Sequence, residues 1–297
     1  MDFLNLDWGL NLTPTELMLA AMAGILAVWM GVVLAKKQAR AFSAQGNGQF
    51  PAVTFIDYGD MRFLHLGTPS VQGSMKLSKP FDIHLEYLQR MMGWLLFTEL
   101  DDVHHLHAMQ LGLGAASLTK FCHHHLHMRT TAIELNPDVV TTCRQWFHLP
   151  EDNATLHVVM GNAADVVHQE TWRGKVDVLQ VDLYDQDAAA PVLDSEDFYA
   201  GCRQLLTPNG CMAVNVFGND ANFEGSVQRI AKSFGSHALW AFKPTPSGNA
   251  IVLAFRTPRT VGKEALLLQA QMIQERWPLL ATKWLKVLAP ISQEKAP

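Results

Sequence analysis

Short apolar runs alternate with longer amphipathic stretches through the middle of the chain. Runs with the length of buried strands lie near residues 107–111, 130–134, 155–159, 176–182 and 211–217. Apolar side chains recur at helical spacing near residues 116–126, 137–147, 195–206 and 222–234. Strand patterns that alternate with helix patterns predict an α/β fold with a parallel, doubly wound sheet.

Two further patterns precede this region. Residues 52–67 read AVTFIDYGDMRFLHLG, with apolar positions on both sides of Tyr58, Gly59 and Asp60, and they predict a β-hairpin. Residues 81–100 have the length of a helix and place leucine and methionine side chains on one side. We therefore expect one long helix between the hairpin and the alternating region.

The end of the chain also has a regular pattern. Two apolar runs at residues 237–243 and 250–256 are separated by PTPSGN, which predicts a second hairpin. Residues 263–288 are amphipathic at helical spacing. Because proline lacks a backbone donor, we expect an interruption at Pro278 in this helical tail.

The apolar run from Leu17 to Ala35 is the outlier of the chain. It contains about 19 uncharged residues, and as a helix it would span roughly 28 Å, close to the thickness of a membrane hydrocarbon core. Acidic residues precede it and basic residues follow it, which favours a cytoplasmic remainder. We expect residues 17–35 to tether a cytoplasmic domain to the inner face of the cytoplasmic membrane, followed by a flexible linker at 43–50. A buried or dimerising hydrophobic helix is the alternative.

Composition and charge narrow the classes of partner. The chain has 297 residues, of which 48% are hydrophobic and 17% charged, and its net charge is −5. A negative chain has no general attraction to phosphate backbones, so we expect no nucleic acid partner. The 4 cysteines form no C-x-x-C pair, which argues against a zinc ribbon and fits a reducing compartment.

A glycine-rich turn follows the first strand predicted for the sheet. In HAMQLGLGAASLTKF, residues 107–121, Gly112 and Gly114 permit backbone conformations that a side chain would forbid. The N–H groups at the start of the next helix favour polar or anionic ligand atoms. By itself such a turn is weak evidence, because a packing turn explains it equally well.

Polar residues end the next three predicted strands. Glu134 lies about 20 residues after the glycine-rich turn, where an acid can accept hydrogen bonds from ribose hydroxyls; a carboxylate at a helix start is the alternative. Asn162 and Ala163 follow the third strand, where an amide and a backbone N–H can read an adenine edge. Asp182 and Asp185 follow the fourth. Because these strand ends meet at one edge of the sheet, they predict a nucleoside site.

The spacing excludes other nucleotide sites. The chain has no G-x-x-x-x-G-K-[ST] sequence, so a P-loop is not expected. The turn GLGAAS lacks the third glycine of the dinucleotide fingerprint. A short turn, a ribose acid and an amide one strand later indicate an S-adenosylmethionine-type fold.

On these motifs the chain resembles the spermidine synthase (polyamine aminopropyltransferase) family, from about Val53 to Phe255. The resemblance rests on LHLGTPSVQGSM, MQLGLGAASLTKF, TAIELNPDVV, VDVLQVDLYDQD and DFYAGCRQLLTPNGCMAVNVFG. It implies a small N-terminal β-domain followed by a Rossmann-like domain with the S-adenosylmethionine-type methyltransferase fold. Members of the family transfer an aminopropyl group from decarboxylated S-adenosylmethionine to putrescine and release methylthioadenosine.

The resemblance implies roles for individual residues. Asp182 would be the general base for the acceptor amine, and Asp185 and Tyr87 would contact the amine substrate. The residues implied to hold the nucleoside part of the donor are Gln72, Gly112, Gly114, Glu134, Asn162 and Ala163. Asn162 and Ala163 replace the Asp-Gly of the family, a mild change because an asparagine oxygen still accepts a hydrogen bond.

The chain departs from the family on the amine side. In the family turn G-G-G-D-G an acid faces the amino end of the donor, and Ala115 stands in its place. The family's Tyr-His-Glu is also missing, because Tyr87 is followed by Leu-Gln. The family's Asp-Pro becomes Asp185-Gln186. The nucleoside half of the site is kept, and the polyamine half is eroded.

We expect four segments along the chain. They are the hydrophobic helix and linker (1–50), the small β-domain (51–80), the Rossmann-like domain (81–258) and the helical tail (259–297). A homodimer is expected from the resemblance. Adjacent histidines at 104–107 and 123–127 cannot all face one metal ion, so we expect no metal.

Three functions remain open from the sequence. The first is an aminopropyltransferase that uses decarboxylated S-adenosylmethionine and a small-molecule di- or polyamine. The second is an S-adenosylmethionine-dependent methyltransferase, because with Ala115 in the turn nothing there repels the carboxylate of the intact donor. The third is a catalytically inactive, membrane-tethered module that binds a nucleoside or a polyamine.

Overall fold

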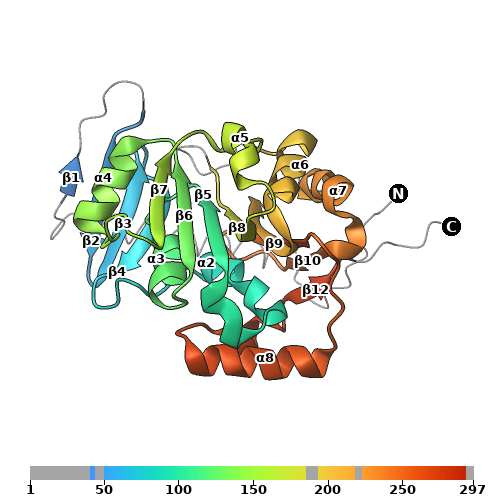
Figure 1. Ribbon diagram of the computed structural model, residues 1–297. Helices are drawn as coiled ribbons and strands as arrows, with labels where there is room; N and C mark the ends of the chain where they lie inside the picture. Colours follow the sequence, from blue (N-terminus) through green and yellow to red (C-terminus); the bar gives the residue numbers. More distant parts are fainter. Residues whose placement is uncertain (1–40, 44–49, 185–192, 218–222, 292–297) are drawn as a thin grey trace, which may run out of the picture.

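Two β-sheets form the framework of the protein. The computed structural model describes residues 41–43, 50–184, 193–217 and 223–291. A 4-stranded sheet lies at one end of an 8-stranded sheet, with helices beside the larger one (Figure 1). The α/β class predicted from the alternating pattern is confirmed.

The small sheet is antiparallel throughout. Its order is β1 (Ala41–Ser43), β2 (Val53–Tyr58), β3 (Met61–Leu66) and β4 (Val71–Lys76). The hairpin predicted at 52–67 is confirmed, and Gly59 takes a φ of +57° in its turn. Because β1 pairs with β2, the sheet includes residues that precede the segment predicted as the β-domain.

The large sheet is mixed. Its parallel strands are β5 (His107–Leu111), β6 (Arg129–Glu134), β7 (Leu156–Met160), β8 (Val176–Val181) and β9 (Leu206–Phe217). They stand in the order β7, β6, β5, β8, β9, so the sheet is wound in both directions from β5. The five predicted strands are confirmed, although β9 begins earlier than expected.

An antiparallel extension follows β9. The predicted C-terminal hairpin is confirmed as β10 (Leu239–Phe242) and β11 (Asn249–Phe255), and β11 pairs antiparallel with β9. A last strand, β12 (Leu288–Pro290), pairs with β10. The tail therefore contributes to the large sheet as well as forming α8 (Lys263–Arg276), which ends before Pro278, and α9 (Ala281–Trp284).

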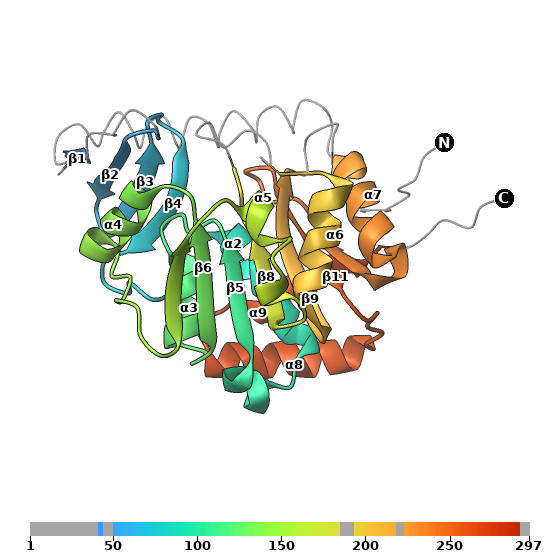
Figure 2. The same cartoon turned by 45° about the horizontal axis from the view of Figure 1, so that its top comes forward.

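Helices cover both faces of the large sheet. The helices of the alternating region are α3 (Ser117–His124), α4 (Pro137–Trp146), α5 (Ala163–Val166), α6 (Glu196–Leu205) and α7 (Phe223–Phe234). Side chains of α3, α8 and α9 share one buried cluster, and those of α5, α6 and α7 share another. Figure 2 shows α6 and α7 at the end of the large sheet opposite the small sheet and α4.

The single helix predicted over 81–100 is wrong. The α-helix α2 covers only Glu86–Met91, and two 3-10 helices follow it, η2 (Gly93–Phe97) and η3 (Leu100–His105). All side chains from 91 to 96 are buried, whereas a straight amphipathic helix would turn some of them to solvent. Gly93 also passes close to β10, because a Cβ there would lie 2.7 Å from the ring of Phe242.

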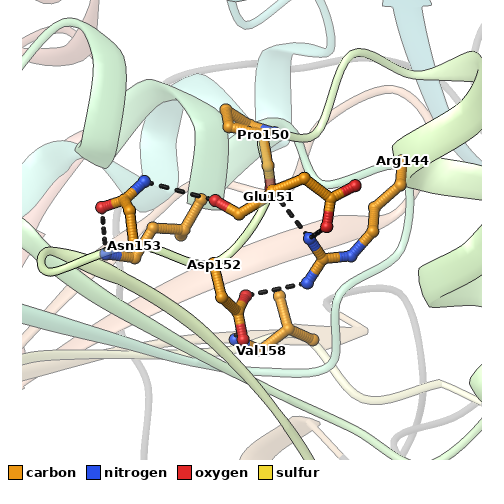
Figure 3. Close-up of polar contacts among 7 residues, drawn as sticks. Arg144, Pro150, Glu151, Asp152, Asn153 and Val158 are labelled. Carbon is orange, nitrogen blue, oxygen red and sulfur yellow. Dashed lines mark hydrogen bonds and ion pairs between the residues drawn. The ribbon is translucent and has the colours of Figure 1, made fainter.

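Arg144 binds three residues of the loop between α4 and β7 through hydrogen bonds and ion pairs (Figure 3). Its guanidinium donates to the carboxylates of Glu151 and Asp152, to the latter at 2.8 Å, and to the carbonyl of Pro150 at 3.3 Å. Asp152 Oδ1 also accepts from the backbone N–H of Val158 at 3.1 Å. Because Val158 belongs to β7, these bonds hold the strand whose end carries the predicted adenine-reading residues.

The predicted membrane anchor at 17–35 lies outside the described residues, as does most of the linker at 43–50. Among the helices of the described ranges, none is both long and apolar enough to cross a membrane. The tether therefore stays a prediction.

Candidate active site

A cavity of about 660 Å³ lies between the small sheet and the carboxyl ends of β5, β6 and β8. This volume falls within the range of small-molecule sites in proteins. The predicted site residues that line it are Gln72, Tyr87, Gly112, Gly114, Glu134, Asn162, Ala163 and Asp182. The remaining predicted residue, Asp185, lies outside the described residues. Strands far apart in sequence thus bring every described candidate to one cavity.

The glycine-rich turn forms the floor of the cavity. Gly112 has a φ of +88°, and a Cβ there would lie 2.5 Å from the carbonyl oxygen of Asp182. Gly114 has a φ of +52°, and a Cβ there would lie 3.2 Å from the carbonyl oxygen of Gln72. Both positions therefore need glycine for conformation, and Gly112 also needs it for space.

Glu134 stands at the end of β6 beside this turn. Its Oε2 accepts from the N–H of Leu113 at 3.0 Å, and its Oε1 accepts from the N–H groups of Leu135 and Asn136, both at 2.8 Å. Burial raises the pKa of Glu134, while the three backbone bonds lower it. The carboxylate is held rigidly in the cavity wall, and its Oε2, which accepts only one of the three bonds, has a lone pair left for a ligand hydroxyl.

Asn162 and Ala163 meet the cavity where β7 passes into α5. Asn162 Oδ1 accepts from the N–H of Ala164 at 2.9 Å and so caps the helix. Ala163 is buried at the first position of the helix, whereas Asn162 is exposed. This capping bond engages the same oxygen of Asn162 that we expected to accept a hydrogen bond from the base.

Asp182 lies just after β8 with both carboxylate oxygens engaged. Its Oδ1 accepts from Nδ2 of Asn215 at 2.8 Å, and its Oδ2 accepts from the hydroxyl of Tyr87 at 3.2 Å. Burial raises the pKa of Asp182 above that of an ordinary aspartate, while these two bonds lower it. Burial also raises the pKa of Tyr87, and the neighbouring Asp182 charge adds to that rise. Asp182 is thus a carboxylate of increased basicity at a cavity floor.

Sequence reasoning missed a polar group on the far side of Asp182. Asn215, in β9, is 2% exposed, and its Oδ1 accepts from Nδ2 of Asn249 at 3.3 Å. The hydroxyl of Tyr184 donates to the backbone carbonyl of Asn215 at 3.2 Å. The available signal was an asparagine inside the apolar run CMAVNVF, since a polar residue in a buried strand needs a partner.

Ala115 lies beside a small recess on the other side of the turn. Ala115 is 3% exposed. A Cβ placed on Gly73 would lie 2.7 Å from the Cβ of Ala115. The recess has a volume of only about 20 Å³, and Leu88 and Leu118 contribute to its wall. Asp182 is the one carboxylate among its described lining residues. The place that the resemblance gives to the turn acid is therefore small and closed by β4.

Metal ligands and cysteines are the other groups that could carry chemistry in the part of the chain that the structure describes. There, no three His, Cys, Asp or Glu side chains lie together as metal ligands would. All four cysteines are free and buried, and burial raises the pKa of their thiols.

The arrangement of the sheets defines a class of protein by its fold, the mixed α/β fold found in spermidine synthases and in methyltransferases. A probable spermidine synthase from Corynebacterium glutamicum superposes with a TM-score of 0.64 at 18% identity, over 77% of this chain and 86% of that one. Human methyltransferase-like protein 13, in complex with SAH, superposes with a TM-score of 0.57 at 20% identity, over 65% of this chain and 92% of that one. These likenesses establish the fold.

Sequence comparison identifies the family within this class. No family model matches the chain. The polyamine aminopropyltransferase of Chromobacterium violaceum is 32% identical over 248 residues, which cover 83% of this chain and 92% of the relative. Its counterpart in Neisseria meningitidis is 32% identical over 209 residues, which cover 70% of this chain and 77% of the relative. The chain belongs to the polyamine aminopropyltransferase family.

Proposed function

We propose that the protein transfers an aminopropyl group from decarboxylated S-adenosylmethionine to a small-molecule di- or polyamine, with Asp182 as general base. Membership of the polyamine aminopropyltransferase family supports the reaction. The observation that carries the proposal is the carboxylate of Asp182, held by Tyr87 and Asn215 at the floor of the cavity. Its raised pKa suits a group that must accept a proton near neutral pH.

The proposed reaction is a displacement at the carbon next to the sulfonium. The acceptor ammonium first gives a proton to Asp182, and the amine nitrogen then attacks that carbon. A C–N bond forms, the C–S bond breaks, and its electron pair stays on sulfur, so methylthioadenosine leaves. Tyr87 and Asn215 orient the two oxygens, which keeps the base within reach of the amine.

The remaining cavity residues fit the nucleoside of the donor. We assign the ribose hydroxyls to Glu134 and Gln72, because Glu134 is a fixed acceptor in the cavity wall and Gln72, in β4, lines the same cavity. We assign the adenine edge to Asn162 and Ala163. A spermidine synthase crystallised with the transition-state analogue AdoDATO has the same fold, with a TM-score of 0.57 at 16% identity.

Product analysis tests the proposed reaction. The purified protein is incubated with decarboxylated S-adenosylmethionine and a panel of diamines and polyamines, and methylthioadenosine is measured by liquid chromatography and mass spectrometry. We expect release with at least one amine and a loss of about 100-fold or more in Asp182→Asn. Asp102→Asn, which changes an exposed acid of η3, is the matched control and should keep full activity. Binding without release for every amine tested would favour the inactive binding module instead.

Ala115 favours methyl transfer as a second candidate function. Its position offers no carboxylate to pair with the donor's amine or to repel the carboxylate of intact S-adenosylmethionine. Titration calorimetry with the two donors separates the candidates. Tighter binding of the decarboxylated donor supports aminopropyl transfer, and tighter binding of the intact donor, with methyl incorporation into an acceptor, supports methyl transfer.

We further propose the organisation expected from the sequence. It comprises a tether at 17–35, a β-domain at 51–80, a Rossmann-like domain at 81–258, a tail at 259–297 and a homodimeric assembly. Membrane flotation of the full-length chain and of a chain lacking residues 1–40 tests the tether. Light scattering of the purified protein tests the dimer.

A further inference from the structure

A buried polar network lies under Asp182, in a part of the core that the proposed reaction does not use. Gln180 precedes Asp182 by two residues in β8 and is 1% exposed. Its Oε1 accepts from Nε2 of Gln110 in β5 at 2.8 Å and from the thiol of Cys122 at 3.5 Å. Thr119 in α3 completes the network by donating to Oε1 of Gln110 at 3.3 Å.

The amide nitrogen of Gln180 reaches a different element. Its Nε2 donates to the carbonyl oxygen of Met91 at 3.4 Å and contacts Sδ of Met92 at 3.2 Å. These two residues end α2, the helix that carries Tyr87. Since Tyr87 bonds to Asp182, the contacts close a ring that runs from β8 through the end of α2 and back to β8.

The helix α2 depends on such contacts for its place. It has only 6 residues, and no side chain caps its N-terminus. A helix this short has little stability of its own, so tertiary contacts decide where it lies. Besides Gln180, Arg90 ties it to the backbone carbonyl of Lys243 at 2.5 Å. The Gln180 contacts tie the C-terminal end of α2 to β8, while the bond from the Tyr87 hydroxyl ties its first turn to Asp182.

Burying the amide of Gln180 costs free energy, and filling the core does not require a glutamine. A buried amide is unfavourable unless its donors and acceptor are paired, and an apolar side chain would fill the same core volume. We propose that Gln180 is a positioning residue that fixes the register of α2 against β8, so that the hydroxyl of Tyr87 reaches the carboxylate of Asp182. The consequence for catalysis rests on the proposed function, but the placement of Tyr87 does not.

The pKa of Asp182 reports this placement without any turnover. The hydrogen bond from Tyr87 lowers that pKa, so its loss must raise it. Tyr87 and Tyr184 interact with the charge of Asp182, and burial raises the pKa of both hydroxyls, so neither titrates in the acid range. A rise seen on acid titration therefore belongs to the carboxylate.

The experiment follows the carboxyl carbon of Asp182 by NMR as pH changes, in uniformly labelled full-length protein without substrate. Asp182→Asn assigns the signal by its loss. We expect Gln180→Met to raise the pKa to the same extent as Tyr87→Phe, and the double variant to show no further rise, because both remove the same hydrogen bond. Gln110→Met is the matched control, since it breaks the network without touching α2, and it should leave the pKa of Asp182 unchanged.

Two outcomes would overturn the inference. One is an unchanged pKa in Gln180→Met when Tyr87→Phe raises it; the other is an equal rise in Gln110→Met. Should Gln180→Met not fold, Met92→Leu decides, because it keeps the core volume and removes only the sulfur contact. It should raise the pKa in the same direction by a smaller amount, and no change would count against the inference. If no aminopropyl transfer is ever detected, these results still stand.

Discussion

Gly73 in β4 and Ala115 in the glycine-rich turn are in direct contact, and Gly73 has no room for a side chain. A Cβ on Gly73 would lie 2.7 Å from the Cβ of Ala115 and 2.8 Å from its backbone nitrogen. The small sheet therefore lies as close to the floor of the cavity as two backbones allow. This contact closes the place where the sequence resemblance implies an acid.

Substitutions at this contact should disturb the site rather than restore the family pattern. We expect Gly73→Ala to lower the free energy of unfolding by about 1–3 kcal/mol, because added volume in a packed contact forces neighbours apart. Gly262→Ala, at the N-cap of α8 with nothing within 4 Å of the added Cβ, is the control and should cost less, because only the N-cap preference for glycine is lost. Urea unfolding measures both. A neutral Gly73→Ala would mean that β4 moves freely against the turn.

Ala115→Asp should weaken nucleoside binding instead of improving aminopropyl transfer. The new carboxylate would be buried against β4 without a partner, which costs several kcal/mol unless the group becomes protonated. Calorimetry with methylthioadenosine should show a Kd raised by about tenfold or more. A faster release of methylthioadenosine from the decarboxylated donor in this variant would contradict the expectation.

The rate should depend on pH through Asp182. Because burial raises its pKa, the base becomes ionised, and the rate rises, at a higher pH than for an ordinary aspartate. Tyr87→Phe removes a hydrogen bond that lowers this pKa, so the acidic limb of the profile should move to higher pH. Profiles of kcat/KM for both proteins test this, and a shift to lower pH would reverse the assigned role of Tyr87.

Asp182→Asn should keep the fold while losing activity. An aspartate with a raised pKa binds its proton more tightly in the folded state, so its contribution to stability falls as pH rises from the unfolded pKa through the folded pKa. Wherever the buried carboxylate is ionised, it is therefore a cost that an amide avoids. Thermal unfolding at pH 7 should give the variant a Tm at least equal to that of the native chain. A marked drop would show that the carboxylate is needed for folding.

Glu134→Gln should act mainly on nucleoside affinity. The amide offers one acceptor oxygen where three backbone N–H groups converge, and its NH₂ group would face one of them. We expect the Kd for methylthioadenosine to rise by about tenfold or more, or about 1.4 kcal/mol. Glu264→Gln, at an exposed acid of α8, serves as the control. Unchanged affinity in Glu134→Gln would place the ribose elsewhere in the cavity.

Asn162→Asp should increase the preference of the site for methylthioadenosine over methylthioinosine. Asn162 Oδ1 caps α5, so its NH₂ group remains for the ligand, whereas an aspartate can cap with one oxygen and accept from the amino group of adenine with the other. The ratio of the affinities for methylthioadenosine and methylthioinosine should shift toward the adenine compound by about fivefold or more. The Tm should change little, because both residues are good caps.

Patterns local in sequence gave most of the fold. The alternation of strands and helices, the two hairpins and the helix break before Pro278 all depend on side-chain periodicity and turn chemistry, and the observed elements agree with them. The helix over 81–100 failed for a tertiary reason. Its middle is buried on all sides against β10 and α8, and Gly93 allows the backbone to approach Phe242.

Some residues of the candidate site could likewise be predicted from the sequence, and others could not. Gly112, Glu134, Asn162 and Asp182 were predictable because each follows a parallel strand, and such strand ends converge at one edge. Asn215 was not, because it lies inside β9, and only the three-dimensional pairing of β8 with β9 brings it to Asp182. The turn acid could be recognised as missing, but the closure of its place by β4 required the contact between the two sheets.

The tail strand β12 has a consequence for how the protein behaves in a crowded solution. It pairs with β10 along Trp240–Phe242 and so covers a strand that would otherwise offer free backbone groups to another chain. The outer edge of β12 is only 3 residues long and ends at Pro290, which has no N–H group to donate. Loss of the residues from Leu288 onward would bare the aromatic strand β10. Such a chain could retain its cavity and yet become prone to edge-to-edge aggregation.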